Sequence, residues 1–188
     1  MLISIILLCM AFSYIVGTLP FGHFIASAKG IDIKTVGTGN PGATNVFKEV
    51  GPLYGILVFI IDIGKGIIIP IVVLTLGSPI WIASLCLFSL ISGHVIPSPW
   101  KTPSGTGMAA AMGGSLALVP VGGLVCLIPT SIVLKITKNP TYTGVCAFLV
   151  AMVADWLIIG NLVEVATVLV CTLIILVKFV VQYRNIKD

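Results

Sequence analysis

The sequence predicts an all-α integral membrane protein with about seven transmembrane helices, folded as a single polytopic domain over residues 1–188. The first observation is composition: 58% of the residues are hydrophobic and 9% are charged, whereas a soluble domain carries about 25% charged residues. The second is that long apolar runs alternate with short polar breaks, with a mean hydropathy of +1.20. The third is that lysine and arginine gather on one side of successive runs, as the positive-inside rule describes for membrane helices.

Seven apolar runs are candidates for these helices, since a helix needs about 20 apolar residues to cross a bilayer. They cover residues 2–26, 53–76, 79–98, 107–119, 121–134, 142–159 and 162–180. The first run ends near Ala26-Ser27-Ala28, which resembles a signal-peptidase site. However, the run is longer than the apolar core of about 7–15 residues in a signal peptide, and no basic residue precedes it. We therefore expect it to be retained as a helix.

The fourth and fifth runs, on either side of Pro120, are each short. They could form two short spans, one long bent span or a re-entrant pair. With the first polar loop in the cytoplasm and seven crossings, the amino terminus is outside and the carboxyl terminus is cytoplasmic. The basic residues that then fall on the cytoplasmic side are Lys29, Lys34, Lys48, Lys101, Lys135, Lys138, Lys178, Arg184 and Lys187. Lys65 is the one basic residue expected within a span.

Charge and cysteine patterns exclude several functional classes. The net charge of +4 comes from basic residues at the ends of spans rather than from one block, so we expect no nucleic-acid partner. The five cysteines lie inside apolar runs and lack the paired spacing of metal ligands. We therefore expect no metal and no cofactor, with the lipid bilayer as the surroundings and homo-oligomerisation left open.

The longest polar segment is a loop at about residues 28–52, on the predicted cytoplasmic side. Its glycines let the backbone approach a ligand closely, and successive backbone N–H groups in such a turn form an anion site. Neutral hydrogen-bonding side chains and one lysine add to that site. The candidate residues are Gly37, Thr38, Gly39, Asn40, Gly42, Thr44, Asn45 and Lys48. If a helix opens at Ala43, its first N–H groups point at the same anion.

The alternative for this loop is a plain polar connector, but connectors between helices usually need only about two to eight residues. Residues 37–42 also match the pattern G-x-G-x-x-G. Because they follow a membrane helix rather than a strand, a dinucleotide-binding fold is excluded.

Two further groups of candidate residues lie in other runs. Asp62 and Lys65 are spaced i,i+3 on one helical face, so they form either a structural ion pair or a phosphate-facing lysine held by its aspartate. His94 is either a structural histidine or a donor to a phosphate. The segment after it is either a second anion-binding turn or a flexible inner loop. Its candidate residues are Lys101, Ser104, Gly105 and Thr106.

Four segments resemble the signatures of a known family, in the same order. Residues 17–22 are similar to G-S-I-P-F-G, and residues 30–45 are similar to G-I-D-I-R-x-x-G-S-G-N-x-G-A-T-N. The sequences D-x-x-K-G at residues 62–66 and G-H-V-I-P at residues 93–97 match two more. The family is the bacterial acyl-phosphate:glycerol-3-phosphate acyltransferases (PlsY-type), and the recognisable similarity covers roughly residues 13–115.

The resemblance implies a seven-span enzyme of the bacterial cytoplasmic membrane, with an active site facing the cytoplasm. It implies acyl transfer from acyl phosphate to the 1-hydroxyl of glycerol 3-phosphate, giving lysophosphatidic acid for phospholipid biosynthesis. By this resemblance the catalytic residues are Thr38, Asn40, Thr44, Asn45 and Lys48. The residues implied to bind substrate or phosphate are Gly37, Gly39, Gly42, Asp62, Lys65, His94, Lys101, Ser104, Gly105, Thr106 and Asn185.

The chain departs from the family pattern at basic positions. The two lysines of the family's F-K-G-G-K-G loop fall on Pro103 and Thr106, and Lys101 lies two residues too early. Lys48 replaces an arginine, which keeps the charge but loses the bidentate fork. These departures leave two functions: an active acyltransferase with a remodelled phosphate site, or a non-catalytic paralogue that binds a phospholipid precursor or partners the active enzyme.

We favour the enzyme, because the loop that matches the family best is intact. A small transporter or channel fits less well, since no inverted repeat is visible in the sequence.

Overall fold

The computed structural model describes residues 2–96 and 104–187, with the side chains of residues 140–141 and 182–187 left out of the description. The regular elements of these residues are helices, as the sequence predicts. They are α1 (Leu2–Thr18), α2 (Phe21–Ala28), α3 (Ala43–Glu49), α4 (Pro52–Thr75), α5 (Ile80–Val95), α6 (Met108–Leu118), α7 (Pro120–Val125), α8 (Leu127–Thr137), α9 (Pro140–Ile158) and α10 (Leu162–Lys187).

The helices are those of a membrane protein, and the predicted fold class is confirmed. Three segments are long and apolar enough to cross a membrane: Leu2–Ala28, Pro52–Thr75 and Leu162–Val181. The shorter apolar helices are Ile80–Val95, Met108–Leu118, Leu127–Thr137 and Tyr142–Ile158. Many large apolar side chains are exposed on the outside of the bundle, where lipid rather than water would cover them.

The first apolar run is one candidate span but not one straight helix. α1 ends at Thr18 and α2 begins at Phe21, with Pro20 between them. Proline has no N–H to donate and disfavours the helical conformation of the residue before it, so it breaks the helix there.

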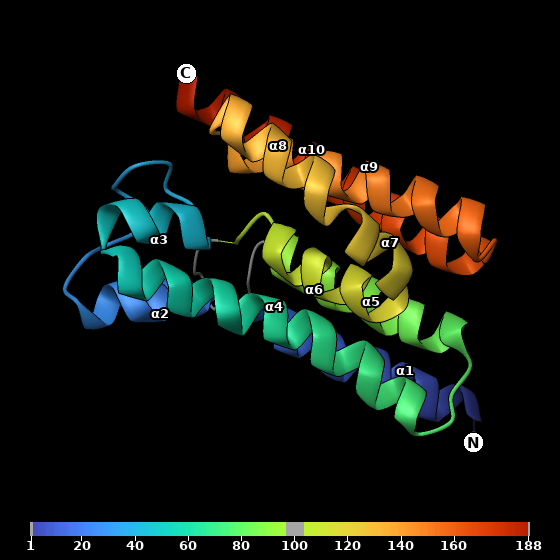
Figure 1. Cartoon of the computed structure of the whole chain (residues 1–188). Coiled ribbons are helices and arrows are strands. Elements are labelled where there is room, and N and C mark those ends of the chain that lie inside the picture. Colours follow the sequence, from blue (N-terminus) through green and yellow to red (C-terminus); the bar gives the residue numbers. More distant parts are fainter. Residues whose placement is uncertain (1, 97–103, 188) are drawn as a thin grey trace.

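With α1 and α2 taken as one segment, the segments α1–α2, α4, α5 and α6 alternate in direction along the bundle (Figure 1). α6 runs away from the end that carries α3, the chain turns at α7, and α8 runs back beside α9 (Figure 1). The structure therefore rules out one long bent span for residues 107–134 and leaves two antiparallel pieces. The two termini lie at opposite ends of the bundle (Figure 1), as an odd number of crossings requires. Which end is cytoplasmic stays a prediction.

Small residues allow the helices to approach closely. A Cβ on Gly17 or Gly93 would collide with the backbone of the facing helix in the α1–α5 pair. A Cβ on Gly66 or Gly113 would do the same in the α4–α6 pair. In lipid, helix association depends on such packing, because burying apolar side chains gains little over leaving them in hydrocarbon.

The predicted ligand loop is anchored rather than loose. Ile33, in its middle, is fully buried in a small core with Ala26, Val46 and Val58. A Cβ on Gly22 of α2 would collide with the carbonyl of Pro41, so this end of the loop lies directly on α2. α3 begins at Ala43, so the condition set for a helix start there is met.

Lys178 lies near the end of the candidate span Leu162–Val181, as it does in the predicted run 162–180, and α10 continues beyond it to Lys187. That Lys178 lies at the cytoplasmic boundary, which leaves Lys65 as the one basic residue within a span, stays a prediction.

Candidate active site

Asn45 organises the glycine-rich loop by hydrogen bonding at both ends of its amide. Its Oδ1 accepts a hydrogen bond from the Thr38 backbone N–H at 2.9 Å, and its Nδ2 donates to the Val36 carbonyl at 3.1 Å. Asn45 lies in the first turn of α3 and is buried, so the side chain ties the loop to that helix. Its amide therefore positions the loop in this structure.

In the turn that the sequence predicts as an anion site, several backbone N–H groups already donate hydrogen bonds within the loop. The Gly42 N–H donates to Asn40 Oδ1 at 2.9 Å, and the Gly39 N–H donates to the Val36 carbonyl at 3.0 Å. Together with the bonded Thr38 N–H, these groups are occupied within the loop. Gly37 and Gly39 have φ values of 57° and 66°, the left-handed region that favours glycine. Side chains at the loop's edge are thus better placed than a backbone nest to meet a ligand.

A buried ion pair with a histidine lies under this loop. Lys65 Nζ lies 2.8 Å from Asp62 Oδ1 and 2.8 Å from His94 Nδ1, linking α4 to α5. Asp62 and Lys65 are 5% and 7% exposed, so water does little to screen them. The Lys65 ammonium also lies 5.9 Å from the centre of the Phe21 ring. The ion pair is therefore present and also holds His94, while a phosphate-facing role for Lys65 stays a prediction.

The segment after residue 103 packs against His94 and α10. A Cβ on Gly105 would collide with Nε2 of His94, so the imidazole lies directly on the Gly105 backbone. The next contact comes from the far end of the chain: Lys178 Nζ donates a hydrogen bond to Ser104 Oγ at 2.7 Å. Four helices, α4, α5, α6 and α10, thus meet at this segment.

A cavity of about 440 Å³ opens beside these groups. Among the described residues that line it, Lys48 is the one cation and Asp62 the one carboxylate. The polar residues that line it are Thr38, Asn40, Thr44, Asn45, Lys48, Asp62, His94, Thr106, Thr130 and Thr143. The cavity lining is thus rich in hydrogen-bonding groups and carries one cation and one carboxylate among the described residues.

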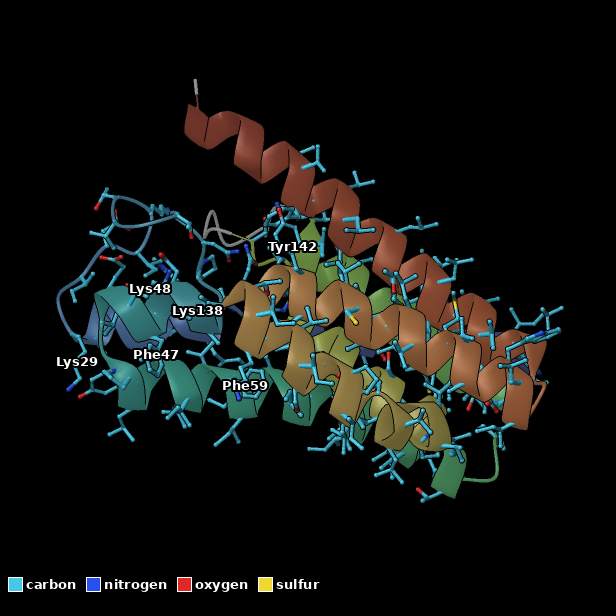
Figure 2. The ribbon with its side chains drawn as sticks, turned by 45° about the horizontal axis from the view of Figure 1, so that its top comes forward. Lys29, Phe47, Lys48, Phe59, Lys138 and Tyr142 are labelled. Carbon is cyan, nitrogen blue, oxygen red and sulfur yellow. The ribbon has the colours of Figure 1, made fainter. Side chains whose placement is uncertain are left out.

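A second set of residues that line the cavity is apolar. It is formed by side chains of α4, α6, α8, α9 and α10. These are Phe59, Met108, Ala109, Met112, Leu134, Ala147 and Phe179. Figure 2 shows two of the lining residues, Lys48 on α3 and Phe59 on α4. Such a cavity fits a ligand with an anionic head and a hydrocarbon tail.

The structure brings most of the predicted site residues together. Gly42 lines the large cavity with the polar residues named above, whereas Ser104 and Gly105 line a small pocket shared with Asp62 and His94. Lys65 is buried just behind Asp62. Lys101 lies outside the described residues, and Asn185 lies in α10 with its side chain outside the description.

Sequence reasoning missed the contribution of the carboxyl-terminal half. Lys178 was expected only as a cytoplasmic span end, and the lining residues Phe59, Thr130 and Phe179 were not singled out. A signal for Lys178 exists in the sequence: it continues the inward-facing positions of α10 at helical spacing. Among the described residues, no group of three or more His, Cys, Asp or Glu side chains is placed to hold a metal ion.

Comparison with known proteins identifies the family to which this chain belongs. The model of the family "Glycerol-3-phosphate acyltransferase" matches residues 7–188. Glycerol-3-phosphate acyltransferase 2 of Dehalococcoides mccartyi is 34% identical over 188 residues, covering 100% of this chain and 89% of that protein. Glycerol-3-phosphate acyltransferase of Aquifex aeolicus is 37% identical over 115 residues, covering 61% of this chain and 60% of that protein. The similarity therefore extends well beyond residues 13–115.

Solved structures agree with the sequence comparison. Two crystal structures of PlsY (YgiH), described as an integral membrane glycerol 3-phosphate acyltransferase, match with TM-scores of 0.84 and 0.81 at 28% sequence identity. They represent its glycerol 3-phosphate and lysophosphatidic acid forms, and each match covers 97% of this chain and 90% of the PlsY chain. From its helices, its cavity and these matches, the chain belongs to the glycerol-3-phosphate acyltransferase family of the PlsY type.

Proposed function

We propose that this protein transfers a fatty acyl group from acyl phosphate to the 1-hydroxyl of glycerol 3-phosphate in the bacterial cytoplasmic membrane. The observation that carries the proposal is the cavity, whose lining combines Lys48 and neutral hydrogen-bonding residues with large apolar side chains. A phosphorylated head would contact the hydrogen-bonding residues, and the acyl chain would lie along the apolar side chains. The glycerol 3-phosphate and lysophosphatidic acid forms of PlsY, a protein with the same fold, support this assignment.

The proposed reaction needs positioning rather than a covalent intermediate. The glycerol hydroxyl oxygen bonds to the acyl carbonyl carbon, and the bond from that carbon to the phosphate oxygen breaks. The products are lysophosphatidic acid and inorganic phosphate, which carries away the hydroxyl proton. Because the donor is already activated, the protein's task is to hold two phosphates and to orient a hydroxyl towards a carbonyl. Lys48, Thr44 and Thr38 are the cavity residues that we assign to the phosphate of one substrate.

The remaining predicted residues take supporting roles in this proposal. Asn45 and Asn40 hold the loop that carries Thr38, through the hydrogen bonds described above. Asp62 and Lys65 hold His94 at the boundary between the cavity and the small pocket. Thr106 lines the cavity beside His94.

We place the site on the cytoplasmic side of the membrane. Lys29, Lys48 and Lys138 all lie at the end of the bundle that carries the loop (Figure 2). The positive-inside rule assigns such an end to the cytoplasm, where soluble phosphorylated substrates are available.

The test is an assay of the purified protein with palmitoyl phosphate and radiolabelled glycerol 3-phosphate, measuring lysophosphatidic acid and phosphate release together. We expect equal amounts of both products. Lack of turnover, together with failure to rescue cells depleted of their own acyltransferase, would overturn the proposal. Retained binding of glycerol 3-phosphate without turnover would identify the non-catalytic paralogue instead.

A further inference from the structure

The inner face of α10 ends in a lysine. Val168, Cys171 and Ile175 are 1%, 2% and 1% exposed, and their spacing of three and four residues places them on one side of the helix. Lys178 occupies the next position of this series, three residues after Ile175. It is half-buried and lies within the candidate membrane span Leu162–Val181. An ionisable residue on the inward face of a span is costly, and such residues usually mark a functional site.

The side chain of Lys178 reaches the border of the active site. Its ammonium donates to Ser104 Oγ at 2.7 Å. Ser104 lines the small pocket together with His94 and Asp62, and Thr106, two residues on, lines the large cavity. Phe179, the residue that follows Lys178, lines the large cavity as well. An ammonium has three N–H donors, and the contact with Ser104 uses one of them.

Lys178 differs from the other two lysines near the site in its pairing or in the helix that carries it. Lys65 forms an ion pair with Asp62, so these two groups compensate each other. Lys48 approaches from α3, which packs on α2 and α4. Lys178 approaches from α10, which packs on α5, α6 and α9. Two cations thus come to the site from different sides of the bundle.

We propose that Lys178 binds a substrate phosphate in the active site, delivering from α10 a positive charge separate from that of Lys48. The inference rests on the proposed function, in which both substrates carry a phosphate group and the site must hold two at once. Ser104 keeps the ammonium directed at the border between the two pockets, and a phosphate oxygen there accepts a further N–H hydrogen bond. Charge-assisted contacts of this kind are among the stronger hydrogen bonds in proteins.

The kinetic experiment compares Lys178→Met and Lys178→Arg with a matched control, Lys135→Met. Lys135 is an exposed lysine in the last turn of α8 and does not line either pocket. We expect Lys178→Met to lower kcat/KM by roughly 10- to 100-fold, as the loss of one charge-assisted hydrogen bond implies. Lys178→Arg should keep most of the activity, and Lys135→Met should stay within about twofold of the parent protein.

Separate titrations of the two substrates identify which phosphate Lys178 binds. A raised KM for glycerol 3-phosphate alone assigns the acceptor phosphate, and a raised KM for acyl phosphate alone assigns the donor phosphate. The variant Ser104→Ala removes the positioning contact and keeps the charge, so its loss should be smaller than that of Lys178→Met. Unchanged kinetic constants in Lys178→Met for both substrates would overturn the proposal.

A second measurement does not depend on turnover. The thermal stability of the detergent-purified protein is measured with increasing inorganic phosphate, since a ligand that binds the folded state raises the unfolding temperature. We expect phosphate to stabilise the parent protein and Lys135→Met equally, and to stabilise Lys178→Met clearly less. If the parent protein shows no turnover, the proposed function fails while this phosphate series still tests Lys178. Equal stabilisation of Lys178→Met and the parent protein would overturn the assignment.

Folding of each variant is checked by size-exclusion chromatography. If Lys178→Met does not elute as a monodisperse species, Lys178→Gln replaces it, because the amide can still donate to Ser104 without a charge. The expected outcomes for Lys178→Gln are those stated for Lys178→Met.

Discussion

Lys65 and His94 are 29 positions apart in the sequence, yet Lys65 Nζ lies 2.8 Å from His94 Nδ1. Since Lys65 also pairs with Asp62, the buried charge of α4 fixes the imidazole of α5. The other ring nitrogen, Nε2, lies against Gly105. His94 is thus held between a membrane-embedded ion pair and the segment that leads into α6.

The ion pair should be essential for stability as well as for activity. Asp62→Asn leaves the Lys65 ammonium buried without its counter-ion, so we expect a loss of about 3–5 kcal/mol in the free energy of unfolding. Thermal unfolding of the detergent-purified variants measures this loss. The double variant Asp62→Asn/Lys65→Met removes both charges, and we expect it to regain stability but not activity. Recovery of full activity by the double variant would show that the pair is structural only.

Lys48 should act mainly through substrate binding. We expect Lys48→Ala to lower kcat/KM for glycerol 3-phosphate by at least about tenfold, because a charged hydrogen bond to phosphate is lost. Lys48→Arg should retain activity, since the charge and donors remain. Lys34→Ala is the matched control: Lys34 is exposed in the same loop and does not line the cavity. Equal kinetics of Lys48→Ala and Lys34→Ala would contradict the assignment of Lys48.

Gly105 should be intolerant of a side chain. A Cβ there would collide with Nε2 of His94, so Gly105→Ala must displace the imidazole or the segment before α6. We expect a fall of about tenfold or more in kcat, since small displacements of catalytic groups are costly. Gly64→Ala provides the control, because no atom lies within 4 Å of the position that its Cβ would take. Assays of both variants at saturating substrate distinguish a specific effect from a general loss of folded protein.

The apolar part of the cavity lining should determine acyl-chain length. Gly144 lines the cavity, and a side chain there would press on the Met108 thioether. We expect Gly144→Leu to shift the preference from palmitoyl phosphate towards shorter donors, since each methylene left unburied costs about 0.8 kcal/mol. The ratio of kcat/KM for octanoyl and palmitoyl phosphate measures the shift. An equal decrease for both donors would place the acyl chain elsewhere.

The topology prediction is open to a direct test. We expect a green fluorescent protein fused after Asp188 to fluoresce in bacterial cells and alkaline phosphatase at the same position to be inactive, because the carboxyl terminus is predicted to be cytoplasmic. A fusion in the turn between α9 and α10, at Gly160, should show the opposite behaviour. The reverse pattern at both positions would place the cavity on the outer side.

Much of the architecture is predictable because it depends on local sequence. The lengths of the apolar runs identify the helices. The break between two runs at Pro120 marks the point where the chain reverses direction between α6 and α8. The glycine-rich loop, with Thr38, Asn40, Thr44 and Lys48, is recognisable as a ligand loop and lines the cavity. What local pattern does not reveal is which donors are already occupied. Asn45 illustrates this, since its predicted donor role is taken up by the loop backbone.

The sequence by itself determined the fold class, the candidate spans and the family, because hydropathy, charge and motifs are properties of neighbouring residues. Only the tertiary structure decided how the candidates combine. In the folded chain Lys65 contacts His94, and Gly105 packs against the imidazole. Lys178 contacts Ser104, which is 74 positions away in the sequence. Contacts of this kind depend on the rotation and separation of packed helices, which side-chain volumes throughout the bundle set together.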